Sequence, residues 1–330
     1  MKQFILFILL TFLLGPSLNA QRGSGTFTVM FYNVENLFDT VDAPGFSDEA
    51  FTPSGNKAWG IERYEKKLTD LARVILSVPG RELPALVGFA EVENAQVLKD
   101  LVEVRGLHRE TYGVVLEETD DPRGIDCGLV YRKDLFTYRS HQLVPVEDLS
   151  GEEYPLRGIL HVAGKGPDGK NLHIFINHWK SRRGGVEATE RLRMYAGIAL
   201  RRELDQLLSR ESDPRIILMG DFNDEPTNRS IMEAVHAANK RKNIWMADLY
   251  NMHYDMHNME AEGTYNYRGT WQMYDQIIVS YSLLNQGSGL TSGYDGGRIL
   301  REAWMLIEDE RHGEQVPLAT YWGDRYKGGA

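Results

Sequence analysis

The sequence predicts an α/β sandwich, in which two β-sheets pack together and helices cover their outer faces. From Thr26 onward, short runs rich in Val, Ile, Phe and Tyr alternate with longer segments of helical periodicity. Several of the short runs are apolar at successive positions, which indicates strands that are buried on both faces. The composition, 42% hydrophobic and 25% charged, is that of a folded globular chain and excludes a disordered or fibrous one.

The strands are predicted where β-branched and aromatic runs are bounded by Gly, Pro, Asn or Asp. In chain order they are Phe27–Asn33, Ala85–Glu91, Gly128–Arg132, Arg157–Val162, Asn171–His178, Arg215–Asp221 and Tyr274–Tyr281.

Helices are predicted where apolar residues recur at helical spacing, over Glu62–Ser77, Ala95–Val104 and Glu187–Ser209. In the last of these, leucines and an alanine form the apolar stripe. Arg193 and Arg201 are expected on other faces of this helix. Met194 and Tyr195 are expected to pack rather than to contact a ligand.

The chain is expected to form one domain over about 24–330, because no repeat, low-complexity segment or proline-rich linker divides it. Cys127 is the single cysteine, which excludes an intrachain disulfide framework and a cysteine-based zinc site. It stands at the start of a predicted strand without an obvious base nearby, so we expect a buried packing residue.

The N-terminus has the features of a secretory signal peptide over residues 1–20. Lys2 precedes an apolar run, and small or polar residues lead to Ala20. The run is short for a membrane span, although an uncleaved N-terminal anchor is the alternative. Either reading places the folded part outside the inner membrane, secreted or periplasmic. No later apolar stretch approaches membrane length.

The net charge of −10 argues against a protein that holds nucleic acid by bulk electrostatics. Phosphate would have to be bound by a local basic patch or a metal ion. Lys180, Arg182 and Arg183, next to His178, form such a patch. The alternative is a solvated loop that hinges at Gly184 and Gly185.

Polar residues stand where the apolar strands end, which is the pattern most informative about function. A carboxylate there is costly unless it is paired, hydrogen-bonded or bound to a metal. Each has a structural alternative: an Asx turn for the Asp-Phe-Asn-Asp segment, a helix terminus for Glu91 and a structural histidine for His178. Together they form an oxygen- and nitrogen-rich set suited to metal-assisted phosphate chemistry: Asn33, Glu91, His178, Asp221, Asn223 and Asp275.

With these motifs in order, the sequence resembles the endonuclease/exonuclease/phosphatase superfamily, which has the DNase I-like fold. The matching segments are YNV at Asn33, AEVEN at Glu91, NHWKSR at His178, GDFND at Asp221 and YDQIIV at Asp275. Leu249–Asn251, Thr264–Trp271 and Thr320–Gly329 are similar to segments of the secreted bacterial branch. The resemblance implies a four-layer α/β sandwich with the site at one edge of the packed sheets.

The resemblance also implies roles for the site residues. Glu91 would be the principal ligand of Mg²⁺ or Mn²⁺, with Asn33 beside it, since hard oxygen ligands suit these ions. Asp221 and Asn223 would orient the attacking water and a phosphate oxygen, and His178 would donate to the phosphoryl oxygens. Asp275 would complete the catalytic set. Arg157 matches a position where the family often places a phosphate-binding arginine, and Lys180 and Arg182 would add positive charge there.

The sequence departs from the family at its C-terminus. The family's Ser-Asp-His-x-Pro segment, whose Asp–His pair serves as the general base, has no counterpart before Ala330. No histidine follows His312 and no aspartate follows Asp324. We therefore expect the domain to be C-terminally incomplete and to lack the last core strand. The chain is either a truncated form of an active hydrolase or a relative without the general base.

The predicted function is a secreted, divalent-metal-dependent phosphodiesterase, most simply an endonuclease-like enzyme acting on nucleic acid. One alternative is a phosphomonoesterase or a sphingomyelinase- or inositol-phosphatase-like hydrolase of the same fold. Another is a metal- or phosphate-binding module without catalysis. His253 and His257 imitate the spacing of a zinc-binding helix. The first is not followed by glutamate, so no metal site is expected there.

Overall fold

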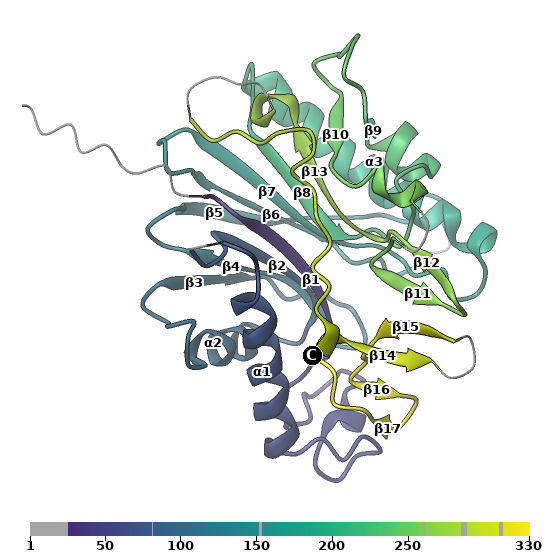
Figure 1. Cartoon of the computed structure of the whole chain (residues 1–330). Helices are drawn as coiled ribbons and strands as arrows, with labels where there is room; N and C mark the ends of the chain where they lie inside the picture. The colour runs from purple at the N-terminus through teal and green to yellow at the C-terminus, as the bar shows by residue number, and fades with distance from the viewer. Residues whose placement is uncertain (1–25, 81, 152–153, 260–261, 285–288, 310–312) are drawn as a thin grey trace, which may run out of the picture.

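The computed structural model of the chain describes residues 26–80, 82–151, 154–259, 262–284, 289–309 and 313–330. Two sheets pack face to face, with α1 and α2 outside one sheet and α3 outside the other (Figure 1). The predicted α/β sandwich is confirmed. The residues of the predicted signal peptide, 1–20, lie outside the described part of the chain.

The four-stranded sheet has the order β1-β2-β4-β3, so β1 lies at its edge. Strands β1 and β2 are parallel, whereas β2 and β4 and then β4 and β3 are antiparallel. The bounds are Val29–Leu37 for β1, Leu86–Val92 for β2, Tyr112–Leu116 for β3 and Asp126–Arg132 for β4.

The seven-stranded sheet has the order β5-β6-β7-β8-β13-β10-β9. Its centre is the parallel pair of β7 and β8, and β13 runs antiparallel to β8. The bounds are Thr137–Val144 for β5, Ile159–Lys165 for β6, Asn171–His178 for β7, Ile216–Asp221 for β8, Ala237–Ala238 for β9, Leu249–Asn251 for β10 and Asp275–Ser280 for β13.

The three long helices start and end within one residue of the predicted positions. They are α1 (Ile61–Leu76), α2 (Ala95–Glu103) and α3 (Val186–Arg210). Asn94 caps α2, because its side-chain oxygen accepts hydrogen bonds from the backbone N–H groups of Gln96 and Val97. No helix in the described ranges is both long enough and apolar enough to cross a membrane.

Short hairpins and helical turns connect or flank the main strands and helices. Three two-stranded hairpins are β11 (Tyr265–Tyr267) with β12 (Thr270–Gln272), β14 (Leu306–Asp309) with β15 (Glu314–Pro317), and β16 (Tyr321–Trp322) with β17 (Arg325–Tyr326). Short helical turns are η1 (Glu49–Phe51), η2 (Ser230–Ala234), η3 (Met256–Asn258), η4 (Tyr281–Leu283) and η5 (Ala303–Met305).

Buried apolar residues form clusters under α1 and α2, between the sheets and under α3. Cys127 lies buried in the cluster between the sheets, as predicted. The expectation that Arg193 and Arg201 lie away from the core is wrong, because both are buried. Arg193 is paired with Asp224, and Arg201 donates to the carbonyl of Ala247, so each charge has partners inside the fold.

Candidate active site

Side chains from both sheets meet at one edge of the sandwich. In the seven-stranded sheet, His178 and Asp275 are the register partners of Asp221 on either side. The amide of Asn33, from β1 of the other sheet, donates to Asp221 Oδ2 at 3.1 Å. Glu91 Oε1, from β2, lies 3.7 Å from His178 Nε2. The structure thus brings together residues that are far apart in the sequence.

Irregular backbone conformation sets the direction of two of these side chains, Glu91 and Asn223. Glu91 has a φ of 65° and stands at a bulge in the pairing of β2 with β4, between Ala90 and Val92. Asn223 has a φ of 50° in the turn after β8. Left-handed backbone at non-glycine residues is costly, and bulges change the direction of a side chain at a sheet edge. Both irregularities fall at predicted site residues, which supports a functional role for them.

The turn after β8 fixes the Asp221 carboxylate. Asp221 Oδ1 accepts a hydrogen bond from the backbone N–H of Asn223 at 2.9 Å, which is the geometry of an Asx turn. Asn223 Nδ2 donates to the carbonyl of Trp179 at 3.1 Å and joins this turn to the end of β7. The Asx turn and the shared site are therefore both present, and the two readings of this segment are compatible.

His178 is a buried, neutral imidazole. Burial, followed by the positive charges of Arg157 and Arg123, lowers the pKa of His178 well below its ordinary value. Its Nε2 lies 3.7 Å from Glu91 and 3.9 Å from Asp221, both too long for hydrogen bonds. Its Nδ1 is buried without a hydrogen-bond partner in the described part of the chain. A neutral ring of this kind has one N–H that it can donate to a substrate.

The carboxylates at this edge are buried and close together. Burial, followed by repulsion from Asp221, raises the pKa of Asp275 to about 8. Burial also raises the pKa of Asp221 to about 6, with Glu91 adding to the shift. Asp275 Oδ1 is buried with no hydrogen-bond partner among the residues described. Such a group of oxygen donors fits a hard divalent cation, which would compensate the charge.

The described side chains are not arranged as a complete metal-binding site. No three acidic, histidine or cysteine side chains within the described ranges are already placed to share one ion. Glu91, Asp221 and Asp275, with the amide oxygen of Asn33, are the donors that would hold it. The assignment of Glu91 and Asn33 as ligands stays a prediction.

Arg157 supports the site rather than facing the groove. Its guanidinium donates to the carbonyls of His178 and Trp179, each at 2.9 Å, and to Asp121 Oδ2 at 2.8 Å. All its hydrogen bonds in the described chain hold backbone or this carboxylate, so the geometry favours a positioning role for it. Lys180 is also turned away from the groove, toward the hydroxyl of Tyr154. Phosphate binding by these two residues stays a prediction.

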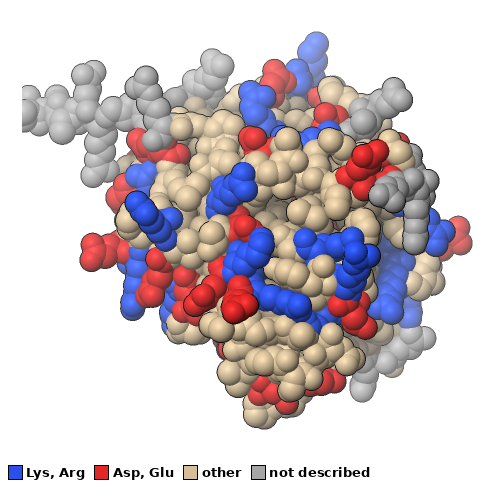
Figure 2. Space-filling view, turned by 60° about the horizontal axis from the view of Figure 1, so that its bottom comes forward, with Lys and Arg blue, Asp and Glu red and all other residues tan. Residues whose placement is uncertain are grey.

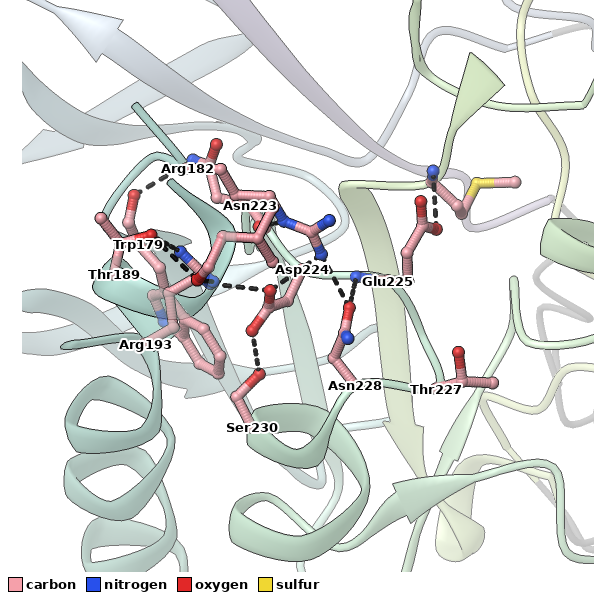
Figure 3. A network of polar contacts seen from close by, with 12 residues as sticks. Trp179, Arg182, Thr189, Arg193, Asn223, Asp224, Glu225, Thr227, Asn228 and Ser230 are labelled. Carbon is pink, nitrogen blue, oxygen red and sulfur yellow. Dashed lines mark hydrogen bonds and ion pairs between the residues drawn. The ribbon is translucent and has the colours of Figure 1, made fainter. Parts of the chain in front are cut away.

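Arg182 lines the groove, and Figure 3 shows its guanidinium among Asn223, Asp224 and Asn228. Its Nε donates to the carbonyl of Asn223, and its NH2 donates to Asp224 and Asn228 at 2.9 and 2.8 Å. The guanidinium also lies 4.8 Å from the centre of the Tyr274 ring. This arrangement fixes the orientation of one positive charge beside Asn223.

Asp224 is the centre of a buried network that sequence reasoning missed (Figure 3). Its carboxylate accepts from Arg182 and from the Ser230 hydroxyl at 2.6 Å, and its Oδ1 lies 2.7 Å from Arg193 Nε. Arg193 in turn donates to Thr189 and to the carbonyl of Val186. The network ties the loop after β7 and the first turns of α3 to the segment after β8. In the sequence, the signal for this network is Asp224 itself, which is the second aspartate of the GDFND segment.

These side chains line a large open groove, of about 2160 Å³, between the two sheets and the short hairpins. Asn33, Glu91, His178, Asp221, Asn223 and Asp275 all contribute to its wall. Figure 2 shows Lys and Arg side chains gathered beside a hollow on one face, with acidic side chains among them. An acidic protein therefore presents local positive charge at this face.

His253 and His257 each make a contact within the fold. His253 is buried, and its Nδ1 accepts from the backbone N–H of Ile277 at 3.2 Å. His257 lies in η3, where its Nδ1 contacts the carbonyl of Tyr254. The segment is not an α-helix, so the spacing of the two histidines does not place them on one helix face.

Two packed mixed sheets with helices outside, and polar strand ends gathered at one edge, define a DNase I-like phosphoesterase-type fold. The chain belongs to the Endonuclease/Exonuclease/phosphatase family, whose match covers residues 28–330. The resemblance seen in the sequence is thereby confirmed. No curated protein resembles the chain closely enough in sequence to count as a match.

Solved structures of low sequence identity share the fold. The human Nocturnin catalytic domain with bound sulfate anion is 18% identical, with a TM-score of 0.51 over 76% of this chain and 80% of that one. A mannosyl-6-phosphatase from Bacteroides thetaiotaomicron is 20% identical, with a TM-score of 0.52 over 77% and 85%. An endonuclease/exonuclease/phosphatase family protein from the same organism is 19% identical, with a TM-score of 0.50 over 77% and 81%.

Proposed function

We propose that this protein is a divalent-metal-dependent phosphodiesterase that hydrolyses nucleic acid and is exported through its residues 1–20. The observation that carries the proposal is the convergence of Asn33, Glu91, His178, Asp221 and Asp275 on one groove. A bound Mg²⁺ or Mn²⁺ would supply Lewis-acid stabilisation of the developing negative charge on the phosphate.

The chain's own residues supply the remaining chemistry. Asp221, oriented by Asn33 and Asn223, accepts a hydrogen bond from the attacking water, and its raised pKa makes it a stronger base than an ordinary aspartate. The neutral His178 ring donates to a phosphoryl oxygen, where charge builds up as the leaving P–O bond breaks. Arg182 supplies fixed positive charge, and Arg157 holds the backbone that carries His178.

A polymeric substrate is favoured over a small phosphomonoester by the shape of the site. The groove is open and extends well past the carboxylates, toward the hairpins β11–β12 and β14–β15. Arginines lie along it as well as beside the carboxylates, among them Arg73, Arg268 and Arg301. A chain of phosphates can use positive charge at several places, whereas one phosphate group cannot.

Hydrolysis of a substrate panel tests the proposal. The purified protein, with any residues that follow Ala330 in its natural chain, is incubated with single-stranded DNA, RNA, a chromogenic phosphodiester, an inositol phosphate and sphingomyelin. Each reaction is run with Mg²⁺, with Mn²⁺ and with EDTA. We expect hydrolysis of nucleic acid and of the chromogenic diester that EDTA abolishes.

Other patterns on the same panel would overturn the proposal. Turnover confined to the inositol phosphate or sphingomyelin would show that the protein acts on a different class of substrate. Binding of metal without any turnover would indicate a non-catalytic module. Turnover that persists in EDTA would remove the metal from the reaction.

Metal affinity is expected to rise with pH between about 6 and about 8. The pKa values of Asp221 and Asp275 are raised to about 6 and about 8, so at the lower pH the metal must displace protons from these carboxyls. Each displaced proton makes affinity change by up to about tenfold per pH unit. Calorimetric titration with Mn²⁺, in two buffers of different ionisation enthalpy, measures both affinity and proton release.

The matched variant for this measurement is Asp275→Asn, which removes the group with the higher pKa. The pH dependence should then flatten above about pH 6, where only Asp275 would still hold a proton. An affinity that is independent of pH in the natural protein would contradict the prediction.

A further inference from the structure

We propose that Tyr265 is a stacking platform for an unpaired nucleobase next to the scissile phosphate, so that the substrate is single-stranded nucleic acid. The inference rests on the proposed function, because it names the substrate class of the same groove. It is carried by the aromatic and arginine side chains that line the same groove as the carboxylates.

A stack of planar groups runs from Arg182 through Tyr274 to Tyr265. The Arg182 guanidinium lies 4.8 Å from the centre of the Tyr274 ring. The Tyr274 and Tyr265 rings are stacked, with centroids 5.6 Å apart and planes at 20°. Tyr274 is buried, whereas Tyr265 is 47% exposed and lines the groove. Tyr265 is therefore the accessible end of the stack, where a flat ring of a ligand can be added.

The platform is anchored to the catalytic strand. Tyr265 begins β11, and the hydroxyl of the preceding Thr264 accepts a hydrogen bond from the backbone N–H of Asp275 at 3.0 Å. Glu225, two residues after Asn223, accepts from the backbone N–H of Met273, which follows β12 at the same end of the hairpin as Thr264. A ring bound on Tyr265 would consequently lie beside the carboxylates and not at a remote part of the groove.

Further arginine–aromatic pairs extend the groove beyond this stack. Arg268 lies 5.1 Å from the centre of the Tyr267 ring, and Arg301 lies 4.7 Å from that of Trp271. Arg73, on α1, lies 3.8 Å from the Trp304 ring. All six side chains line the groove. Alternating positive charges and planar rings match a strand that alternates phosphates and bases.

An unpaired strand fits these groups better than a duplex or a lipid headgroup. In a duplex both faces of each base are stacked on neighbouring bases, so an exposed tyrosine ring gains little contact. A phosphocholine or inositol headgroup has no flat unsaturated ring to place against Tyr265. The stacked rings therefore favour a base that is not paired with a complementary base.

Binding measured in EDTA separates this inference from the proposed function. Fluorescence anisotropy compares a labelled thymidine oligomer with an abasic strand of the same length and charge. The natural protein should bind the thymidine strand more tightly. Tyr265→Ala should weaken that binding by roughly 5- to 150-fold, the range of one base–aromatic stack, and leave abasic binding unchanged. Tyr265→Phe should retain the natural preference.

Trp245→Ala is the matched control, since Trp245 is 74% exposed and does not line the groove. It should change neither affinity. Equal weakening of both strands by Tyr265→Ala, or no base preference in the natural protein, would overturn the inference. A base preference without hydrolysis in any metal would uphold the platform and reject the proposed catalysis. Hydrolysis without a base preference would uphold the proposed catalysis and reject the platform.

Discussion

Replacing Asp221 by asparagine is expected to lower metal-dependent phosphodiester hydrolysis by roughly 10²–10⁴-fold, the range for loss of a positioned acid–base group. Asparagine has nearly the same size and can still accept the hydrogen bond from the Asn223 backbone through its oxygen. Its NH₂ group cannot accept the second hydrogen bond, which comes from Asn33 Nδ2. It also has no negative charge for a cation and cannot take a proton from water.

The same substitution should not unfold the protein. The pKa of Asp221 is raised by burial, so its charged form is less favourable in the folded chain than in the unfolded chain. Above the ordinary pKa of aspartate the unfolded state loses the proton first, and stability therefore falls as pH rises toward about 6. Asparagine removes this cost, and with it the repulsion toward Asp275. At neutral pH its urea midpoint should equal or exceed that of the natural protein.

Initial rates with the chromogenic diester and urea denaturation are measured on the same preparations. Asp213→Asn, the same change at an exposed residue between α3 and β8, should leave both quantities unaltered. Natural rates in Asp221→Asn would show that Asp221 is not in the catalytic machinery. A lower urea midpoint in that variant would show that its carboxylate stabilises the fold.

Replacing Arg193 by methionine is expected to lower the free energy of unfolding by roughly 3–5 kcal/mol, the cost of removing one partner from a buried ion pair. Arg193 is fully buried, and Asp224, its partner at 2.7 Å, is 1% exposed. Methionine fills much of the same space but leaves the carboxylate with less positive charge. It also leaves the Thr189 hydroxyl and the Val186 carbonyl without the donor they have now.

Urea denaturation followed by circular dichroism measures this loss. Arg202→Met is the matched control, because Arg202 is the same residue type on the exposed face of α3 and should change stability by no more than about 0.5 kcal/mol. Combining Arg193→Met with Asp224→Asn should cost less than the sum of the single changes, since the two residues interact. An additive double variant, or an Arg193→Met variant as stable as the control, would contradict the buried pair.

Arg193→Met should also affect the groove if it still folds. Arg182 and Arg193 both contact Asp224. Loosening of this network would therefore leave the Arg182 guanidinium less firmly oriented. Weaker substrate binding, seen as a higher KM with little change in kcat, would reveal such a positioning role. A merely structural role would lower the amount of folded protein and leave KM as it was.

The strands that carry the site were predictable because their signals are local. The run ending in His178 has the same bounds in the sequence prediction and in the structure, since an apolar strand stops where polar residues begin. Strand β5 was not predicted, because most of its residues are polar and exposed. It exists through its pairing with β6 at the edge of the sheet, and neighbouring residues do not encode that pairing.

Arg157 and Arg193 show where prediction from residue type stopped. The family resemblance implies a phosphate contact for Arg157, which stays a prediction, and helical periodicity placed Arg193 off the apolar stripe. In the fold, Arg157 holds the carbonyls at the end of β7, and Arg193 is enclosed beside Asp224. The position of a guanidinium depends on acceptors that other segments bring within about 3 Å, and chain periodicity carries no information about them.

The amino-acid sequence alone was sufficient for the layer architecture, for the positions along the chain of most core strands and for the polar residues at their ends. Those features follow from hydrophobic periodicity and turn chemistry, which act over neighbouring residues. Only the tertiary structure decided that Asn33 reaches Asp221, that Asp224 joins two arginines, and that Tyr265 extends a ring stack beside Asp275. Such contacts depend on how the two sheets face each other, because hydrogen bonds, ion pairs and ring stacking act over a few ångströms in space and not along the chain.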